Sequence, residues 1–262
     1  MARTFLLTLQ FDGSGFVGWQ RQAEGRSVQG EVERVLERLA GHRVVAHGAG
    51  RTDAGVHAVG LAVSCTMPPS WEAAALRRAL NALLPRDCWV ARIEPMRPGF
   101  HARRSARERA YRYDVGTDDA AASPFRRRWE WALGRPLDGT RLDAAAQAVL
   151  GEHDFSAFAA RGEPKPHYRC RLSTARWVVR PDGRGWRFEV AADRFLHHMV
   201  RMLVGTMVDA GLGRRPVADV ARLLAARSNQ DTSPPAPPQG LWFVAARYDL
   251  DDYLVPGEDA RP

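Results

Sequence analysis

The side chains best suited to chemistry lie in one short connection, Gly48 to Ala58, between two strand-like runs. Its sequence, Gly-Ala-Gly-Arg-Thr-Asp-Ala-Gly-Val-His-Ala, places glycines around Arg51, Asp53 and His57. Glycines allow a sharp turn and a close approach of the backbone to a ligand. A carboxylate held beside an arginine in such a loop is a candidate reactive group. The alternative is a structural turn in which Asp53 is simply solvated.

A tyrosine among arginines is the second candidate. Tyr111 follows Arg103, Arg104, Arg107 and Arg109 and precedes Arg112. An aromatic ring in such a setting can stack on an unpaired base while the cations hold its phosphates. A core tyrosine beside surface arginines would give the same pattern. Phe125-Arg-Arg-Arg-Trp129 is another basic cluster with aromatic edges, for which a solvated face is the usual outcome.

The third candidate is an arginine on an apolar helix that we predict to begin near Phe195. At 100° per residue, His197 and Arg201 share one flank of its buried stripe. A cation at the edge of a buried stripe needs an acceptor. That acceptor is either a local carboxylate or Asp53, reached across a cleft between two halves of the molecule.

Composition limits the class of protein. The 262 residues have 45% hydrophobic content and a net charge of +8, which favours an anionic partner such as nucleic acid. The three cysteines form no Cys-x-x-Cys pair and indicate buried thiols in a reducing compartment. No signal peptide pattern or membrane-spanning run is present, so we expect a cytoplasmic protein.

The elements that position these candidates follow from periodicity. Strands are predicted at residues 5–11, 43–46, 59–65 and 89–93, with helices after Ser27 and Ser70, each serine acting as a cap. This β-α-β-β-α-β order is the ferredoxin-like unit. A similar plan recurs with strands at 109–115, 172–179, 186–192 and 241–248, and with helices at 140–150, from 195 and from Pro216. We therefore predict an α+β fold with a half at 1–105, a half at 106–250 and a frayed tail at 251–262.

The sequence offers no metal site or nucleotide cofactor motif. His42, His47 and His57 lack ligand spacing, and His197 and His198 are expected to face different directions on a helix. The Gly48 to Gly50 pair is not followed by a helix, so it is not a phosphate-binding loop.

Together these motifs resemble the tRNA pseudouridine synthase A family. The resemblance rests on residues 12–22, 50–58, 100–103, 111–113, 195–201 and 237–241, which read DGSGFVGWQRQ, GRTDAGVHA, FHAR, YRY, FLHHMVR and PPQGL. It implies an isomerase that converts uridine to pseudouridine in the anticodon stem-loop of tRNA, at tRNA positions 38, 39 and 40. It also implies two RNA-recognition-like halves in one mainly antiparallel sheet flanked by helices, a central cleft, and a homodimer.

The resemblance implies roles for individual residues. Asp53 matches the catalytic aspartate, Tyr111 the tyrosine that stacks on the target base, and Arg201 the arginine that pairs with the aspartate. Arg51 matches a residue that flips and holds the nucleotide, and we expect Arg103, His57 and His197 to assist in binding. The reaction is redox-neutral and needs no cofactor. The alternatives are a non-catalytic RNA-binding protein and an RNA N-glycosylase that uses the same basic cleft.

Overall fold

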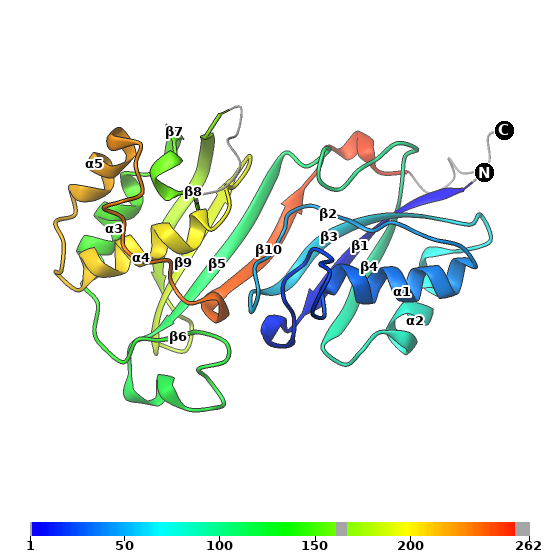
Figure 1. Ribbon diagram of the computed structural model, residues 1–262, viewed down its shortest axis with the longest axis horizontal. Helices are drawn as coiled ribbons and strands as arrows, with labels where there is room; N and C mark the ends of the chain where they lie inside the picture. The colour runs from blue at the N-terminus through cyan, green and yellow to red at the C-terminus, as the bar shows by residue number, and fades with distance from the viewer. Residues whose placement is uncertain (1, 161–166, 255–262) are drawn as a thin grey trace. The chain divides into compact units, whose positions relative to one another are not determined.

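The computed structural model describes residues 2–160 and 167–254. The chain divides into two compact units, one made of Met1–Arg109 with Phe243–Pro262 and the other of Ala110–Trp242. Ten strands and five α-helices occur within the described residues (Figure 1). Nearly all strand pairs are antiparallel and helices cover the sheets, which confirms the predicted α+β class.

The first unit has the predicted β-α-β-β-α-β order. Its elements are β1 (Arg3–Phe11), α1 (Val28–Ala40), β2 (His47–Gly48), β3 (His57–Met67), α2 (Ala73–Leu83) and β4 (Cys88–Met96). The strands run in the order β4-β1-β3, followed by β10 (Leu241–Arg247), and β2 pairs with β3. The two helices lie side by side (Figure 1). The predicted strand at 43–46 is displaced to β2, because the chain after α1 reaches β3 only at His47.

The helices of this unit show how local sequence sets their ends. Ser27 caps α1 by accepting a hydrogen bond from the Gly30 N–H at 3.2 Å, as predicted. Ser70 does not cap α2, so that prediction is wrong. The Trp71 N–H bonds to the Pro68 carbonyl in a tight turn, and α2 begins only after Glu72, which supplies no side-chain cap.

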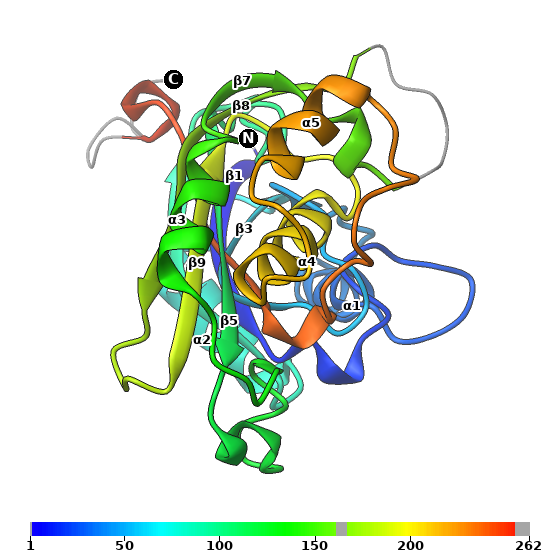
Figure 2. The ribbon, with the colours of Figure 1, turned by 90° about the vertical axis from the view of Figure 1, so that its left-hand side faces the viewer.

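The second unit contains β5 (Glu108–Gly116), β6 (Trp131–Ala132), α3 (Gly139–Gln147), β7 (Gly151–Asp154), β8 (Arg169–Val179), β9 (Gly185–Ala192), α4 (Met199–Gly211) and α5 (Asp219–Ala226). The strands run in the order β5-β9-β8-β7, and β6 pairs with β5. The predicted hairpin of β8 and β9 is confirmed. Figure 2 shows α5 beside β7 and α3 beside α4. The helix predicted from Pro216 begins three residues later, at Asp219, after a turn closed by the Pro216 carbonyl.

The division of the chain differs from the predicted halves at both ends. The first unit extends to Arg109 rather than 105, and it also takes the residues from Phe243 onward, because β10 lies next to β3. The predicted tail at 251–262 is partly ordered structure. Residues Leu250–Asp252 form a 3-10 helix and Tyr253 pairs with Met96, whereas 255–262 lie outside the described residues.

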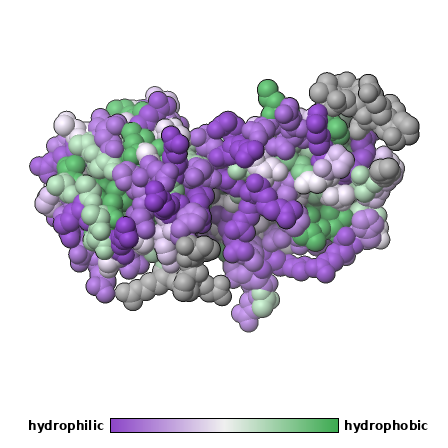
Figure 3. All heavy atoms as spheres, turned by 90° about the horizontal axis from the view of Figure 1, so that it is seen from above, coloured by the Kyte–Doolittle hydropathy of each residue, from purple (hydrophilic) through white to green (hydrophobic). Residues whose placement is uncertain are grey.

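The polar surface and the buried cysteines are what the composition predicts. Hydrophilic residues make up most of the face of each unit shown in Figure 3, with small apolar areas among them. Cys65, Cys88 and Cys170 are buried free thiols, as predicted. Within the described residues, no helix has the length and apolar character needed to span a membrane.

Candidate active site

The loop that carries Asp53 joins β2 to β3 and is fastened along its length to the segment that follows β1. The Trp19 N–H donates to the Thr52 carbonyl at 3.0 Å, and the Gly55 N–H donates to the Phe16 carbonyl at 3.4 Å. Within the loop, the Val56 N–H closes a turn onto the Asp53 carbonyl at 3.2 Å. Asp53 is half-buried. The two loops thus hold the backbone on both sides of Asp53.

Two glycines make this close approach of the loops possible. Gly18 has φ 110°, and a Cβ there would lie 2.5 Å from the Thr52 carbonyl oxygen. A Cβ on Gly13 would overlap the carbonyl oxygen of Val56. Only residues without a side chain fit at these two positions, so Gly13 and Gly18 are needed to bring the backbone against the Asp53 loop.

His57 lies inside the unit. Its side chain has 0% exposure, and its Nδ1 accepts a hydrogen bond from the Gly13 N–H at 3.0 Å. That nitrogen therefore carries no proton in this arrangement, and the Asp12 carboxylate 3.3 Å away is a neighbour rather than an ion-pair partner. His57 links the end of β1 to the start of β3, which differs from the exposed position that contact with RNA would require.

Two aromatic residues of the segment 12–22 belong to the core. Phe16 and Trp19 are each 4% exposed. A Cβ on Gly48 would lie 2.7 Å from the indole of Trp19, so the ring packs directly on the β2 backbone. These residues support the loops.

Two predicted residues of the first unit remain, Arg51 and Arg103. Both are exposed, as expected for cations that meet RNA. Arg109 has another role that the sequence did not reveal. Its Nε donates to the Ala49 carbonyl at 3.2 Å and its Nη1 to the Ala106 carbonyl at 2.9 Å, while Nη2 donates to the Arg103 carbonyl. This guanidinium ties the backbone before β5 to the start of the Asp53 loop.

In the second unit, Tyr111 lies on β5 with its ring held by a second aromatic residue. The ring is 8% exposed and meets Phe195 edge to face, with centroids 5.0 Å apart and planes at 83°. Such a pair fixes the ring orientation. Sequence reasoning placed Phe195 on a helix and did not pair it with Tyr111.

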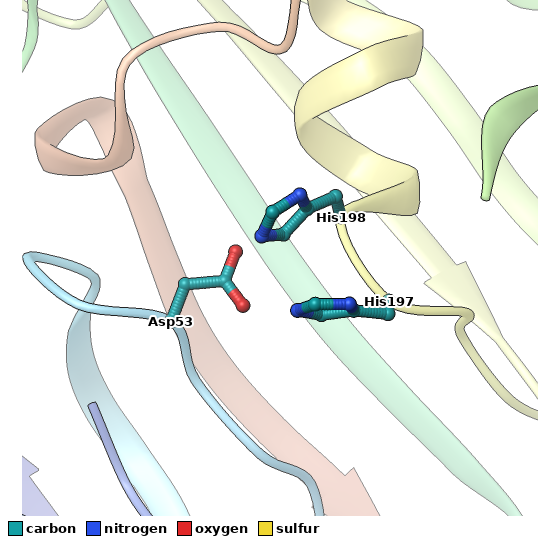
Figure 4. Close-up of side chains that lie close together, drawn as sticks. All are labelled: Asp53, His197 and His198. Atoms are coloured by element: carbon teal, nitrogen blue, oxygen red, sulfur yellow. The ribbon is translucent and has the colours of Figure 1, made fainter. Parts of the chain in front are cut away.

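The helix that carries Arg201 begins later than predicted. His198 has φ 61°, a left-handed conformation, and α4 starts at Met199. His197 and Arg201 therefore do not share one helix face, and the prediction of an i, i+4 pair is wrong. A left-handed residue cannot continue the α-helical path, so the histidines form a turn before the helix. The centroids of the two imidazole rings lie 4.0 Å apart, and His197 is exposed. Figure 4 shows that these imidazoles come from this turn and that Asp53 comes from the loop before β3.

Arg201 is held by the proline-rich segment, residues 233–240. Its Nε donates to the Ala236 carbonyl at 2.7 Å, and the Ala236 N–H donates to the Arg201 carbonyl at 2.9 Å. The Tyr113 hydroxyl donates to the Pro237 carbonyl at 2.7 Å, and burial raises the pKa of Tyr113 well above its usual value. A Cβ on Gly205 would overlap the Pro234 carbonyl oxygen. The segment thus binds the Arg201 guanidinium at Nε, a contact for which its composition gave no signal.

Several known proteins are similar to this chain over most of its length. The family model described as tRNA pseudouridine synthase matches residues 8–103 and 145–249. The tRNA pseudouridine synthase A of Moorella thermoacetica is 39% identical over 244 residues, covering 92% of this chain and 98% of that protein. The Myxococcus xanthus protein of the same name is 42% identical over 90% of this chain and 88% of its own. That of Acidiphilium cryptum is 40% identical over 96% and 98%. The chain therefore belongs to the tRNA pseudouridine synthase family.

Proposed function

We propose that this protein isomerises uridine to pseudouridine in the anticodon stem-loop of tRNA, at tRNA positions 38, 39 and 40. The observation that carries the proposal is the half-buried Asp53 on a loop whose backbone is bonded on both sides, in a chain of the tRNA pseudouridine synthase family. A carboxylate fixed before the substrate arrives needs little reorganisation during the reaction.

The reaction exchanges one bond for another at the same uracil. The glycosidic bond between ribose C1′ and uracil N1 breaks, the detached base turns, and C1′ bonds to C5, which loses its proton while N1 gains one. Asp53 serves by attacking the sugar or the base, or by removing the C2′ proton, and these routes stay open. The target base must first leave its stack, which costs a few kcal/mol. No oxidant, reductant or metal is required by this balance.

The other residues receive supporting roles. Tyr111, whose ring Phe195 orients, stacks on the target base, and Arg201 pairs with the Asp53 carboxylate. The bond from Arg201 Nε to the Ala236 carbonyl supports this role, because it sets the direction of the guanidinium. The exposed Arg51 holds the flipped nucleotide, and Arg103 and His197 contact the RNA.

His57 is assigned differently. Since it is buried and accepts a hydrogen bond from the Gly13 backbone, we place it as a positioning residue for the Asp53 loop. We further propose that the protein works as a cytoplasmic homodimer without metal or cofactor. The net charge of +8 supports tRNA as its partner.

The test is release of tritium from tRNA labelled at uracil C5. The protein should release tritium without strand damage, whereas an N-glycosylase would leave abasic sites and a simple RNA-binding protein would do neither. Asp53→Asn should abolish release while tRNA binding persists. Asp251→Asn, which alters an exposed carboxylate of the same unit, is the matched control and should keep the wild-type rate. Wild-type turnover by Asp53→Asn would refute the catalytic role.

A further inference from the structure

An insert between β5 and α3 carries features that the proposed active site does not use. It covers residues 117–134 and includes a 3-10 helix, Asp119–Ala122, and the strand β6. Figures 1 and 2 show it projecting beyond the end of β5, away from α5. It lies in the segment 104–144, between the two stretches that the family model matches.

Residues Ser123 to Trp129, here called the arginine turn, are held in one conformation. The N–H groups of Arg126 and Arg127 both donate to the Ser123 carbonyl, at 3.0 and 2.9 Å. The Trp129 N–H then donates to the Arg126 carbonyl at 2.8 Å. These successive bonds make a compact helical turn rather than an open loop.

Arg126, the first of the three consecutive arginines, anchors the turn. Arg126 points inward, where its Nη1 lies 2.6 Å from Asp118 and its Nη2 lies 2.9 Å from Glu130. Glu130 is 2% exposed and also pairs with Arg180 after β8. The hydrogen bond from Arg126 lowers the pKa of the Asp118 carboxyl. Both acidic groups are thus engaged by cations of the same unit, and the turn is fixed to the end of the sheet.

The outward side of the arginine turn is aromatic and cationic. Phe125 is 87% exposed, and Arg127 and Arg128 are exposed beside it. The guanidinium of Arg128 lies over the Trp129 ring, 5.1 Å from its centroid. Trp129 in turn stacks on Trp242, with centroids 5.8 Å apart and planes at 28°. Arg128 therefore rests on a pair of stacked aromatic rings.

We propose that the arginine turn is a second RNA contact, in which Phe125 stacks on an unpaired base of the tRNA and Arg127 and Arg128 hold the adjacent phosphates. This inference rests on the proposed function for the identity of the RNA. A largely exposed ring near two exposed cations matches what single-stranded RNA offers, a flat base next to charged phosphates. Because the ion pairs order the turn in advance, binding loses little conformational freedom.

A second copy of the chain fits this surface less well. Two identical turns facing each other would bring exposed arginines of like charge together, which opposes association. The exposed acid of the insert, Asp119, lies on the 3-10 helix ahead of the turn rather than within it.

Three variants and one control test the proposal by fluorescence anisotropy with a tRNA transcript and with a fully paired RNA duplex. Phe125→Leu keeps apolar bulk but removes the π surface, and Phe125→Trp keeps both. We expect Phe125→Leu to raise the Kd for tRNA about fivefold or more, Phe125→Trp to stay near wild type, and neither to alter duplex binding. Arg127→Ala should lower the slope of log Kd against log salt by about 0.7 to 0.9.

The matched control is Arg176→Ala, which removes one exposed cation that pairs with Glu189 on the neighbouring strand. Its Kd should stay within about twofold of wild type, because this guanidinium is already paired with a carboxylate at the surface and is not proposed to meet a phosphate. Equal Kd for Phe125→Leu, Arg127→Ala and wild type would overturn the proposal. The proposal would also be overturned if Phe125→Leu changed the sedimentation coefficient of the protein but not its Kd for tRNA. That result would show that the turn contacts a second copy of the chain. If the wild-type protein releases no tritium, the proposed function fails, whereas the binding comparison still decides the role of the turn.

Discussion

Replacement of His57 tests whether a buried side chain controls the position of the catalytic loop. Its Nδ1 is the acceptor for the Gly13 N–H at 3.0 Å, and the ring has no exposed surface. His57→Leu fills similar space but offers no acceptor. His57→Asn is smaller, but its side-chain oxygen can occupy the position of Nδ1. The difference between the two variants therefore reports the hydrogen bond.

The expected magnitude follows from burial. A buried N–H that loses its partner costs about 1–3 kcal/mol. His57→Leu should therefore be less stable than His57→Asn by about this much, less the cost of the cavity that the smaller asparagine leaves. For a chain of this size, each kcal/mol corresponds to about 2–4 °C in Tm. Because Gly13 packs directly on the Val56 carbonyl, a shift of its backbone would also move the Asp53 loop. A displacement of about 1 Å can cost about 100-fold in rate.

The assay combines urea unfolding with single-turnover tritium release at saturating tRNA. We expect His57→Leu to lose both stability and rate, and His57→Asn to recover much of the rate. Equal rates for the two variants would refute the positioning role, even if their stabilities differ. If the two variants are also equally stable, the Gly13 hydrogen bond contributes nothing to stability.

Three further changes follow from the packing and the pKa shifts. Gly18→Ala should lower the free energy of unfolding in urea by about 1–3 kcal/mol and slow tritium release. At φ 110° an alanine is strained, and its Cβ would lie 2.5 Å from the Thr52 carbonyl oxygen. Wild-type stability and rate would contradict the close fit. Tyr113→Phe should lower stability by about 0.5–1.5 kcal/mol through loss of the bond to the Pro237 carbonyl, and an unchanged unfolding midpoint would count against it. Burial raises the pKa of the Cys65 thiol from 9.0 to about 12, so the stability that it contributes is complete below pH 9.0 and is lost as pH rises toward 12. Iodoacetamide should therefore leave native Cys65 unmodified at pH 9 and alkylate it in urea, and rapid alkylation of the native protein would contradict its burial.

Local sequence was enough to predict most elements of the fold. The alternation of apolar residues in β1, and the apolar spacing and serine cap of α1, depend on neighbours within a few positions, and both predictions are confirmed. Element ends were less predictable, because the left-handed His198 that delays α4 and the turn that delays α2 have no distinct local signature.

The sequence by itself determined the family, the α+β class and the loop in which Asp53 lies, since a distinctive run of residues and the periodicity of its flanks are local properties. Only the tertiary structure decided how the supporting residues act. His57 meets Gly13 across 44 positions, and Arg201 meets Ala236 across 35. Such bonds depend on which backbone groups packing brings together, and no pattern of residue types along the chain specifies that pairing.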